Sequence, residues 1–153
     1  GILVAMKIKK ITTNKKQYLS LLLLADEQES MVDKYLDRGN MYVLFQDDTA
    51  ISECVVTDEG NKILEIKNLA TNPDFQHQGY AQKIVEFIEQ KYRGQFDILQ
   101  VGTGDSPLTL PFYEKIGFRV SGRKRNFFVD NYDHPIFEAG KQLVAMIYLQ
   151  KRL

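Results

Sequence analysis

The chain has 153 residues, of which 44% are hydrophobic and 26% are charged. This composition is typical of one globular domain with its own core, so we expect a single domain over residues 1–153. Twenty basic and twenty acidic residues give a formal net charge of zero, which argues against partners held by a global field, such as nucleic acid or an anionic membrane.

Scarce cysteine and histidine limit the redox and metal chemistry of the chain. The one cysteine, Cys54, excludes an internal disulfide, and two isolated histidines, His77 and His134, do not make a His/Cys metal cage. We therefore expect no metal cofactor and a reducing, cytoplasmic location. The apolar run over residues 19–25 is far shorter than the ~20 residues that span a bilayer, so we expect no membrane segment.

The first five residues differ in character from the rest of the chain. Residues 1–5 have no basic segment and no cleavage pattern of a signal peptide, and they precede Met6. We expect the native chain to begin at Met6 and residues 1–5 to be a remnant of cloning.

Local periodicity predicts an N-terminal half made of one strand, two short helices and a three-stranded meander. Apolar and polar residues alternate at the start, and helical spacing continues from there as far as Gly39-Asn40. The predicted elements are a strand at 7–12, helices at 15–25 and 27–36, and strands at 41–46, 50–57 and 62–71. Short polar turns between the last three strands indicate antiparallel pairing.

The pattern changes after Pro73 to that of a longer amphipathic helix. Its apolar residues fall on one helical face, namely Ala81, Ile84, Val85, Ile88 and Tyr92. Beyond this helix the predicted elements are a strand at 96–102, a short helix at 112–116, and strands at 118–129 and 143–151. This order predicts a mixed α+β fold in which helices cover a sheet.

The segment over residues 69–81 carries the first indication of a binding site. A predicted strand runs there through a turn into a helix N-terminus, where unpaired backbone amides and the helix dipole favour a phosphate. Gly79 and Ala81 leave this backbone accessible, and the Lys-Ser/Thr pair of nucleoside triphosphatases is absent. The alternative is a simple strand-to-helix connection without a ligand.

A second segment, Phe112-Tyr113-x-x-x-Gly117-Phe118, comes after one more predicted strand. Together with Gln76-x-x-Gly79-x-Ala81, it resembles the signature segments of the GNAT superfamily of acetyl-CoA-dependent N-acetyltransferases, and the predicted element order over the whole chain is also similar to that family's. The resemblance implies a GNAT-like fold, with a central mixed, mostly antiparallel sheet of about seven strands that is splayed in the middle and flanked by about four helices.

The resemblance also implies acetyl-CoA as co-substrate and assigns residues to it. Main-chain groups along the pantetheine arm would come from Leu69, Ala70 and Thr71. Amides around the pyrophosphate would come from Gln76, His77, Gln78, Gly79, Tyr80 and Ala81. Asp105 stands near the position where many members have an Asn that contacts the cofactor, and Tyr113 would lie beside the thioester sulfur.

Tyr113 suits a catalytic role because acetyl transfer from a thioester expels a thiolate. The reference pKa of a phenol is near 10 and that of a thiol near 8.5, so full proton transfer runs uphill by about 2 kcal/mol. We therefore expect a hydrogen bond from the Tyr113 hydroxyl to the developing thiolate rather than complete protonation. The alternative is an aromatic side chain that only packs beneath the helix.

No residue is an evident general base. Relatives that acetylate protein N-termini place a Glu in the fifth strand, whereas the matching position here is Gln100, which cannot accept a proton. Glu65 is a catalytic candidate by residue type, with Glu53 as a second, although carboxylates on strands are more often only solvated. A base that acts through water, or no base at all, is left open.

The resulting hypothesis is an N-acetyltransferase that moves an acetyl group from acetyl-CoA to a primary amine of a small molecule or peptide by direct attack in a ternary complex. A non-catalytic acyl-CoA sensor or interaction module is the alternative. The expected partners are acetyl-CoA and an amine acceptor, with no nucleic acid and no membrane, and a homodimer is left open.

Three further features have structural explanations that we expect to hold. The run Arg123-Lys124-Arg125 either attracts an acidic substrate or forms a solvated sheet edge, and we expect the edge. His134 lies in a predicted loop and is a candidate for lining an acceptor pocket. Cys54 lies on a predicted strand, where we expect it to fill the core.

Overall fold

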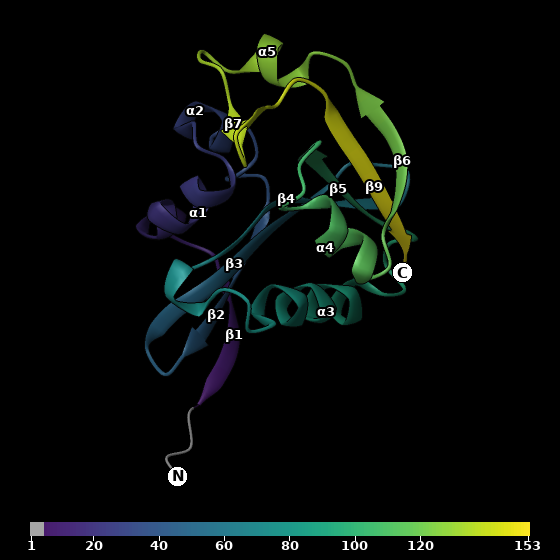
Figure 1. Ribbon diagram of the computed structural model, residues 1–153. Coiled ribbons are helices and arrows are strands. Elements are labelled where there is room, and N and C mark those ends of the chain that lie inside the picture. Colours follow the sequence, from purple (N-terminus) through teal and green to yellow (C-terminus); the bar gives the residue numbers. More distant parts are fainter. Residues whose placement is uncertain (1–4) are drawn as a thin grey trace. The chain divides into compact units, whose positions relative to one another are not determined.

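The computed structural model describes residues 5–153 (Figure 1). Its internal contacts divide the chain into two compact units. Unit 1 comprises the described residues up to Asp58 together with Ile66–Arg93, and unit 2 comprises Glu59–Glu65 together with Gly94–Leu153. The expectation of one domain over the whole chain stays a prediction. The suggested cloning remnant lies, apart from Ala5, outside the described residues.

The predicted fold class is confirmed. Within residues 5–153, seven strands form one sheet in the order β1-β2-β3-β4-β5-β9-β6, and a separate two-stranded sheet is formed by β7 and β8. The pairs β1–β2, β2–β3, β5–β9 and β6–β9 are all antiparallel. Five α-helices and two 3-10 helices accompany these strands in the described part of the chain.

Unit 1 contains the predicted strand, short helices and meander. Its elements are β1 (Met6–Ile11), the 3-10 helix η1 (Lys15–Tyr18), α1 (Leu19–Ala25), α2 (Glu29–Val32), β2 (Asn40–Gln46), β3 (Thr49–Asp58), the end of β4 (Ile63–Thr71), η2 (Pro73–Phe75) and α3 (Tyr80–Tyr92). The α2 helix is shorter than the predicted 27–36. The chain continues in turns after it, and Tyr35 and Leu36 in those turns are buried in the same core as Leu22 and Val55. That burial accounts for the helical spacing of the apolar residues.

The α3 helix packs on β3 through the predicted apolar stripe. Ile84, Val85 and Ile88 are at most 1% exposed. At the C-terminal end of the helix, the Tyr92 hydroxyl lies 2.6 Å from the Tyr42 hydroxyl and accepts a hydrogen bond of 3.0 Å from the Asn40 side chain. These contacts attach the end of α3 to β2 and thereby orient the helix within unit 1.

Unit 2 is built around β9, which lies between β5 and β6. Its elements are the start of β4, β5 (Ile98–Gly104), α4 (Leu110–Lys115), β6 (Arg119–Lys124), α5 (Phe127–Asn131), β7 (Phe137–Glu138), β8 (Lys141–Gln142) and β9 (Met146–Arg152). All six residues of β6 are exposed at the sheet edge, as expected for the basic run at its end.

The prediction of one strand over residues 118–129 is wrong beyond Lys124. Asn126 adopts a left-handed conformation with φ of 55°, the chain turns, and α5 begins. This turn allows Phe128 to pack with Ile136 and Leu143 in a small separate core, which an edge strand continuing through residue 128 would not allow.

The β7–β8 hairpin was also not predicted, and β9 begins three residues later than the predicted 143. Ala139 and Gly140, which connect β7 to β8, both have positive φ, 51° and 76°. Two such residues in succession are typical of a tight two-residue hairpin turn, usually formed by Asn-Gly or Asp-Gly, and Ala-Gly does not signal it.

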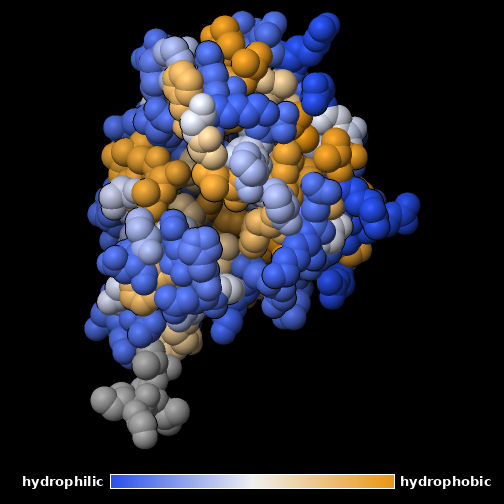
Figure 2. Space-filling model, viewed as in Figure 1, coloured by the Kyte–Doolittle hydropathy of each residue, from blue (hydrophilic) through white to orange (hydrophobic). Residues whose placement is uncertain are grey.

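Polar side chains cover much of the molecular face seen in Figure 2, with hydrophobic residues between them. Among residues 5–153, the large hydrophobic residues that are exposed are Leu24, Leu108, Val120, Val129, Phe137 and Val144. No helix among residues 5–153 is long and apolar enough to cross a membrane.

The attachment of α3 to β2 can be tested with Tyr92→Phe. This variant removes the hydroxyl that contacts the buried Tyr42 hydroxyl, and an unsatisfied buried polar group costs about 1–3 kcal/mol. We expect urea denaturation to show that loss in the free energy of unfolding. Tyr18→Phe is the control, because the Tyr18 ring contacts Phe45 by its edge and its hydroxyl has no hydrogen-bond partner among the described residues. Equal stability of the two variants would contradict the assignment.

Candidate active site

The N-terminus of α3 in unit 1 is open to a ligand. Gly79 caps it in a left-handed conformation with φ of 85°, and among residues 5–153 no side-chain cap accepts a hydrogen bond from the first amides of the helix. A Cβ atom added at Gly79 would meet no atom within 4 Å. Glycine is therefore required here by the backbone conformation, and the surface above it is open. The dipole of this 13-residue helix favours an anion at such an end.

The strand that leads to this helix end is held by side-chain hydrogen bonds. The Ser52 hydroxyl donates to the Ala70 carbonyl oxygen at 2.9 Å, and the Gln76 carboxamide donates to the Thr71 carbonyl oxygen at 3.3 Å. Ala70 is buried, whereas Leu69 and Thr71 are half-buried. Their contacts with a pantetheine arm stay predictions, as do those of residues 76–81 with a pyrophosphate.

Tyr113 lies on α4 in unit 2 and is only 7% exposed. Its ring packs edge-on against Phe112 and Phe118, with ring centroids 5.0 and 5.5 Å away. Gly117 ends the helix with φ of 104°, and the Phe118 amide then donates to the Tyr113 carbonyl oxygen at 2.9 Å. The ring is thus packed against its neighbours, which agrees with either role, and the catalytic role of the hydroxyl stays a prediction.

The carboxylate of Glu65 is buried, contrary to the expectation of a solvated strand residue. Glu65 is 5% exposed, and its Oε1 accepts a hydrogen bond of 2.5 Å from the Gln100 carboxamide. Gln100 in turn accepts one of 2.7 Å from Gln150 on β9. Burial raises the pKa of Tyr148, and the negative charges of Glu65 and Glu59 raise it further. Gln100, which stands where those relatives have a Glu, therefore orients the Glu65 carboxylate on the neighbouring strand β4.

Glu53 is also buried, in unit 1, and again the expectation of exposure is wrong. It is fully inaccessible on β3, and neither carboxylate oxygen has a hydrogen-bond partner among the described residues. Burial raises its pKa well above the ordinary value of 4.5. The neighbouring Cys54 is buried as predicted, and its pKa is raised first by burial and then by the charge of Glu53. Both side chains therefore favour their neutral forms.

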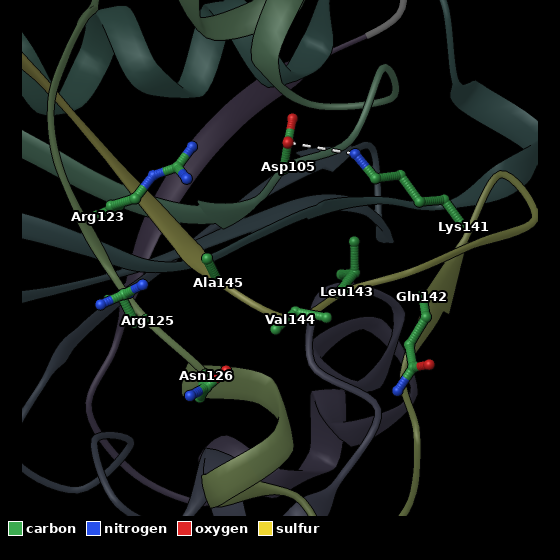
Figure 3. A pocket seen from close by; sticks show the side chains of 9 residues that line it. All are labelled: Asp105, Arg123, Arg125, Asn126, Lys141, Gln142, Leu143, Val144 and Ala145. Atoms are coloured by element: carbon green, nitrogen blue, oxygen red, sulfur yellow. Dashed lines mark ion pairs between the residues drawn. The ribbon is translucent and has the colours of Figure 1, made fainter.

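A pocket of about 310 Å³ opens in unit 2 where the ends of β5 and β6 approach the chain between β8 and β9 (Figure 3). It is lined by Asp105, Arg123, Arg125, Asn126, Lys141, Gln142, Leu143, Val144 and Ala145. Asp105 forms an ion pair of 3.2 Å with Lys141, and its contact with a cofactor stays a prediction.

His134 is not part of this lining; it pairs with Asp133 at 2.5 Å in an exposed loop. No cluster of metal-ligating side chains occurs within residues 5–153.

The burial of Glu53 predicts a specific pH dependence of stability. Because its pKa is raised in the folded protein, its contribution to stability is fully present below the unfolded pKa and is lost as the pH rises through the folded pKa. Glu53→Gln has no such loss. We expect its free energy of unfolding, relative to the unsubstituted protein, to increase as the pH rises above the ordinary carboxyl pKa of 4.5, by at most about 1.4 kcal/mol per pH unit.

Denaturant titrations at several pH values measure this difference. The exposed Glu114→Gln is the control, for which the difference should be independent of pH. A flat difference for Glu53→Gln as well would show that the carboxyl group is ionised in the folded protein.

Known proteins resemble this chain in sequence. Residues 37–120 match the family model described as the acetyltransferase (GNAT) domain. The uncharacterized N-acetyltransferase YvbK of Bacillus subtilis strain 168 is 35% identical over 139 residues, which are 90% of this chain and 89% of that protein.

Solved structures agree with the family match. A GNAT family acetyltransferase from Elizabethkingia anophelis with acetyl-CoA bound is 33% identical, with a TM-score of 0.91 over 97% of this chain and 98% of that one. An IAA acetyltransferase from Bacillus cereus is 32% identical, with a TM-score of 0.89 over 97% and 100%. A B. subtilis acetyltransferase in complex with CoA is also 32% identical, with a TM-score of 0.88 over 97% and 99%. With its motifs, its sheet order and these relatives in agreement, the chain belongs to the GNAT family of acetyltransferases.

Proposed function

We propose that this acetyltransferase moves an acetyl group from acetyl-CoA to a primary amine of a small molecule or peptide by direct attack in a ternary complex. The observation that carries the proposal is the likeness, over 97% of the chain, to an acetyltransferase that holds acetyl-CoA. A second relative of similar identity holds CoA. Acetyl-CoA supplies an acetyl group activated as a thioester.

The described residues suit this co-substrate without a cationic side chain. The uncapped amides at the N-terminus of α3 would hold the pyrophosphate, and the left-handed Gly79 keeps that surface open. The Ala70 carbonyl oxygen accepts one hydrogen bond from Ser52. Main-chain groups of Leu69, Ala70 and Thr71 would lie along the pantetheine arm.

Direct attack is favoured over a covalent acetyl-enzyme because the chain has no activated thiol. Cys54 is the one cysteine in the sequence, it is fully buried on β3, and burial raises its pKa. A thiolate nucleophile is the opposite case, with a lowered pKa and access to substrate. The amine of the acceptor is therefore the nucleophile that attacks the acetyl carbonyl carbon.

Tyr113 and Glu65, both in unit 2, would assist the leaving thiolate and the attacking amine. The Tyr113 hydroxyl donates a hydrogen bond to the sulfur as the thiolate leaves, as the relative pKa values of phenol and thiol indicate. Glu65, oriented by Gln100, accepts the proton from the amine, directly or through one water molecule. Glu53 is not suited to this role, because its side chain is completely buried and out of reach of a substrate amine.

The cellular setting is inferred from the same chemistry. We propose a reducing, cytoplasmic location, since the one cysteine is free. Zero net charge supports partners without nucleic acid. The homodimer stays a prediction that sedimentation equilibrium would test.

Gly79→Val tests the pyrophosphate position. Valine strongly disfavours the left-handed conformation that Gly79 adopts, so the amides before α3 should rearrange and acetyl-CoA affinity should fall by about tenfold or more. Titration calorimetry measures this affinity. Gly60→Val is a matched control: Gly60 has φ of 83° and no atom within 4 Å of its added Cβ. An equal loss of acetyl-CoA affinity in both variants, or unchanged affinity in Gly79→Val, would show that the pyrophosphate does not bind at the N-terminus of α3.

Tyr113→Phe tests the enzyme against a sensor. Removal of the hydroxyl should lower turnover by about tenfold to a thousandfold while acetyl-CoA affinity holds. Thiol release with a panel of amines measures turnover, mass spectrometry identifies the acetylated amine, and Tyr18→Phe is the control. Unchanged turnover would show that Tyr113 only packs against its neighbours and that its hydroxyl has no catalytic role. Tight acetyl-CoA binding without thiol release from any amine by the unsubstituted protein would instead favour the sensor.

A further inference from the structure

The pocket in unit 2 has a surplus of positive charge, although the chain as a whole is neutral. Arg123, Arg125 and Lys141 line it together with one carboxylate, Asp105. Lys141 is paired with that carboxylate at 3.2 Å. Among residues 5–153, neither arginine makes an ion pair. The two guanidinium groups are therefore the charges that the pocket leaves uncompensated.

The strand geometry directs both arginines to the same side. Side chains two residues apart on an extended chain point to the same face, about 7 Å apart. Arg123 lies near the end of β6 and Arg125 comes directly after it, and both line the pocket whereas Lys124 between them does not (Figure 3). The Lys124 ammonium instead lies 5.8 Å from the Phe127 ring centroid. The basic run is thus a sheet edge, as predicted, that also presents two of its three charges to a cavity.

Part of the remaining lining is apolar. Leu143, Val144 and Ala145 succeed one another along one side of the pocket (Figure 3), and Leu143 is held in the small core with Phe128. A volume of about 310 Å³ is at the lower limit of ligand sites, which span about 300–1,000 Å³. Carboxamides of Asn126 and Gln142 add neutral hydrogen-bonding groups to the lining. The pocket matches a small molecule with a short apolar body and an anionic end.

We propose that the amine acceptor of this acetyltransferase carries a carboxylate, which the guanidinium groups of Arg123 and Arg125 hold in this pocket. The inference rests on the proposed function and names the acceptor class for it. Guanidinium groups bind planar carboxylates through paired hydrogen bonds. The apolar side of the pocket favours the carboxylate of a small amino acid over a phosphate group of the co-substrate, whose proposed site is the N-terminus of α3.

Matched acceptors test the proposal. Linear amino acids from glycine to 6-aminohexanoate are each compared with the corresponding carboxamide, with kcat/KM expressed per free amine. In the unsubstituted protein, kcat/KM for the best acid should exceed kcat/KM for its carboxamide by about tenfold to a hundredfold, which is the effect of a charged hydrogen-bonded pair. Arg123→Gln and Arg125→Gln should each remove most of this preference by raising KM for the acid, with little change in kcat. Acetyl-CoA affinity, measured by calorimetry, should not change.

Lys124→Gln is the matched control, since it removes the same charge from the same segment outside the pocket. It should keep the preference for acids. Amides that react as well as acids, or an equal effect of Lys124→Gln, would overturn the proposal. Loss of acetyl-CoA affinity in the arginine variants would also overturn it, by assigning the pocket to a phosphate of the co-substrate.

A direct binding measurement separates this proposal from the proposed function. If no amine releases thiol, the acetyltransferase activity fails, yet the pocket is still tested by titrating the protein with 4-aminobutanoate or 4-aminobutanamide. Nuclear magnetic resonance of the arginine side-chain NεH groups, assigned through the two variants, should show shifts at Arg123 and Arg125 with the acid alone. Absence of those shifts would overturn the carboxylate site whatever the activity.

Discussion

A protein without net charge can hold an anion only where local dipoles or charges are left uncompensated. Each unit contains such a place among residues 5–153. In unit 1 the left-handed Gly79 begins α3 without a side-chain cap, so the first helical amides remain available. In unit 2 Arg123 and Arg125 face a pocket whose only carboxylate, Asp105, is taken by Lys141. The proposed roles, pyrophosphate in the first place and acceptor carboxylate in the second, both result from this constraint.

The buried carboxylates of Glu53 and Glu65 differ in the same way: one is compensated by a hydrogen-bond donor and the other is not. Glu65 has a hydrogen-bond donor at 2.5 Å in Gln100, whereas both oxygens of Glu53 lack one among the described residues. Burial therefore raises the pKa of Glu53, and its complete inaccessibility suits a neutral core residue better than a base. Gln100, which matches the position of a Glu in relatives that acetylate protein N-termini, is the donor that orients the Glu65 carboxylate on the next strand.

Features that depend on local pattern were predictable. The apolar stripe of α3 is buried as expected, and the two motifs correctly indicated the family. Features that depend on packing between distant residues were not. Phe128 turns into a core with Ile136 and Leu143 in place of extending β6, and the burial of Glu53 and Glu65 is set by strand register, which residue type does not reveal. The pocket at Arg123 likewise exists only because the chain around Leu143 folds beside β6.

The central claim is that the amine attacks acetyl-CoA directly while both are bound. Initial rates of thiol release, measured with both substrates varied, test it most directly. The account predicts intersecting lines in double-reciprocal plots and no acetylated protein when acetyl-CoA is added without acceptor. Parallel lines, together with an acetyl group recovered on the protein, would contradict it by showing a covalent intermediate on a chain whose one cysteine is buried.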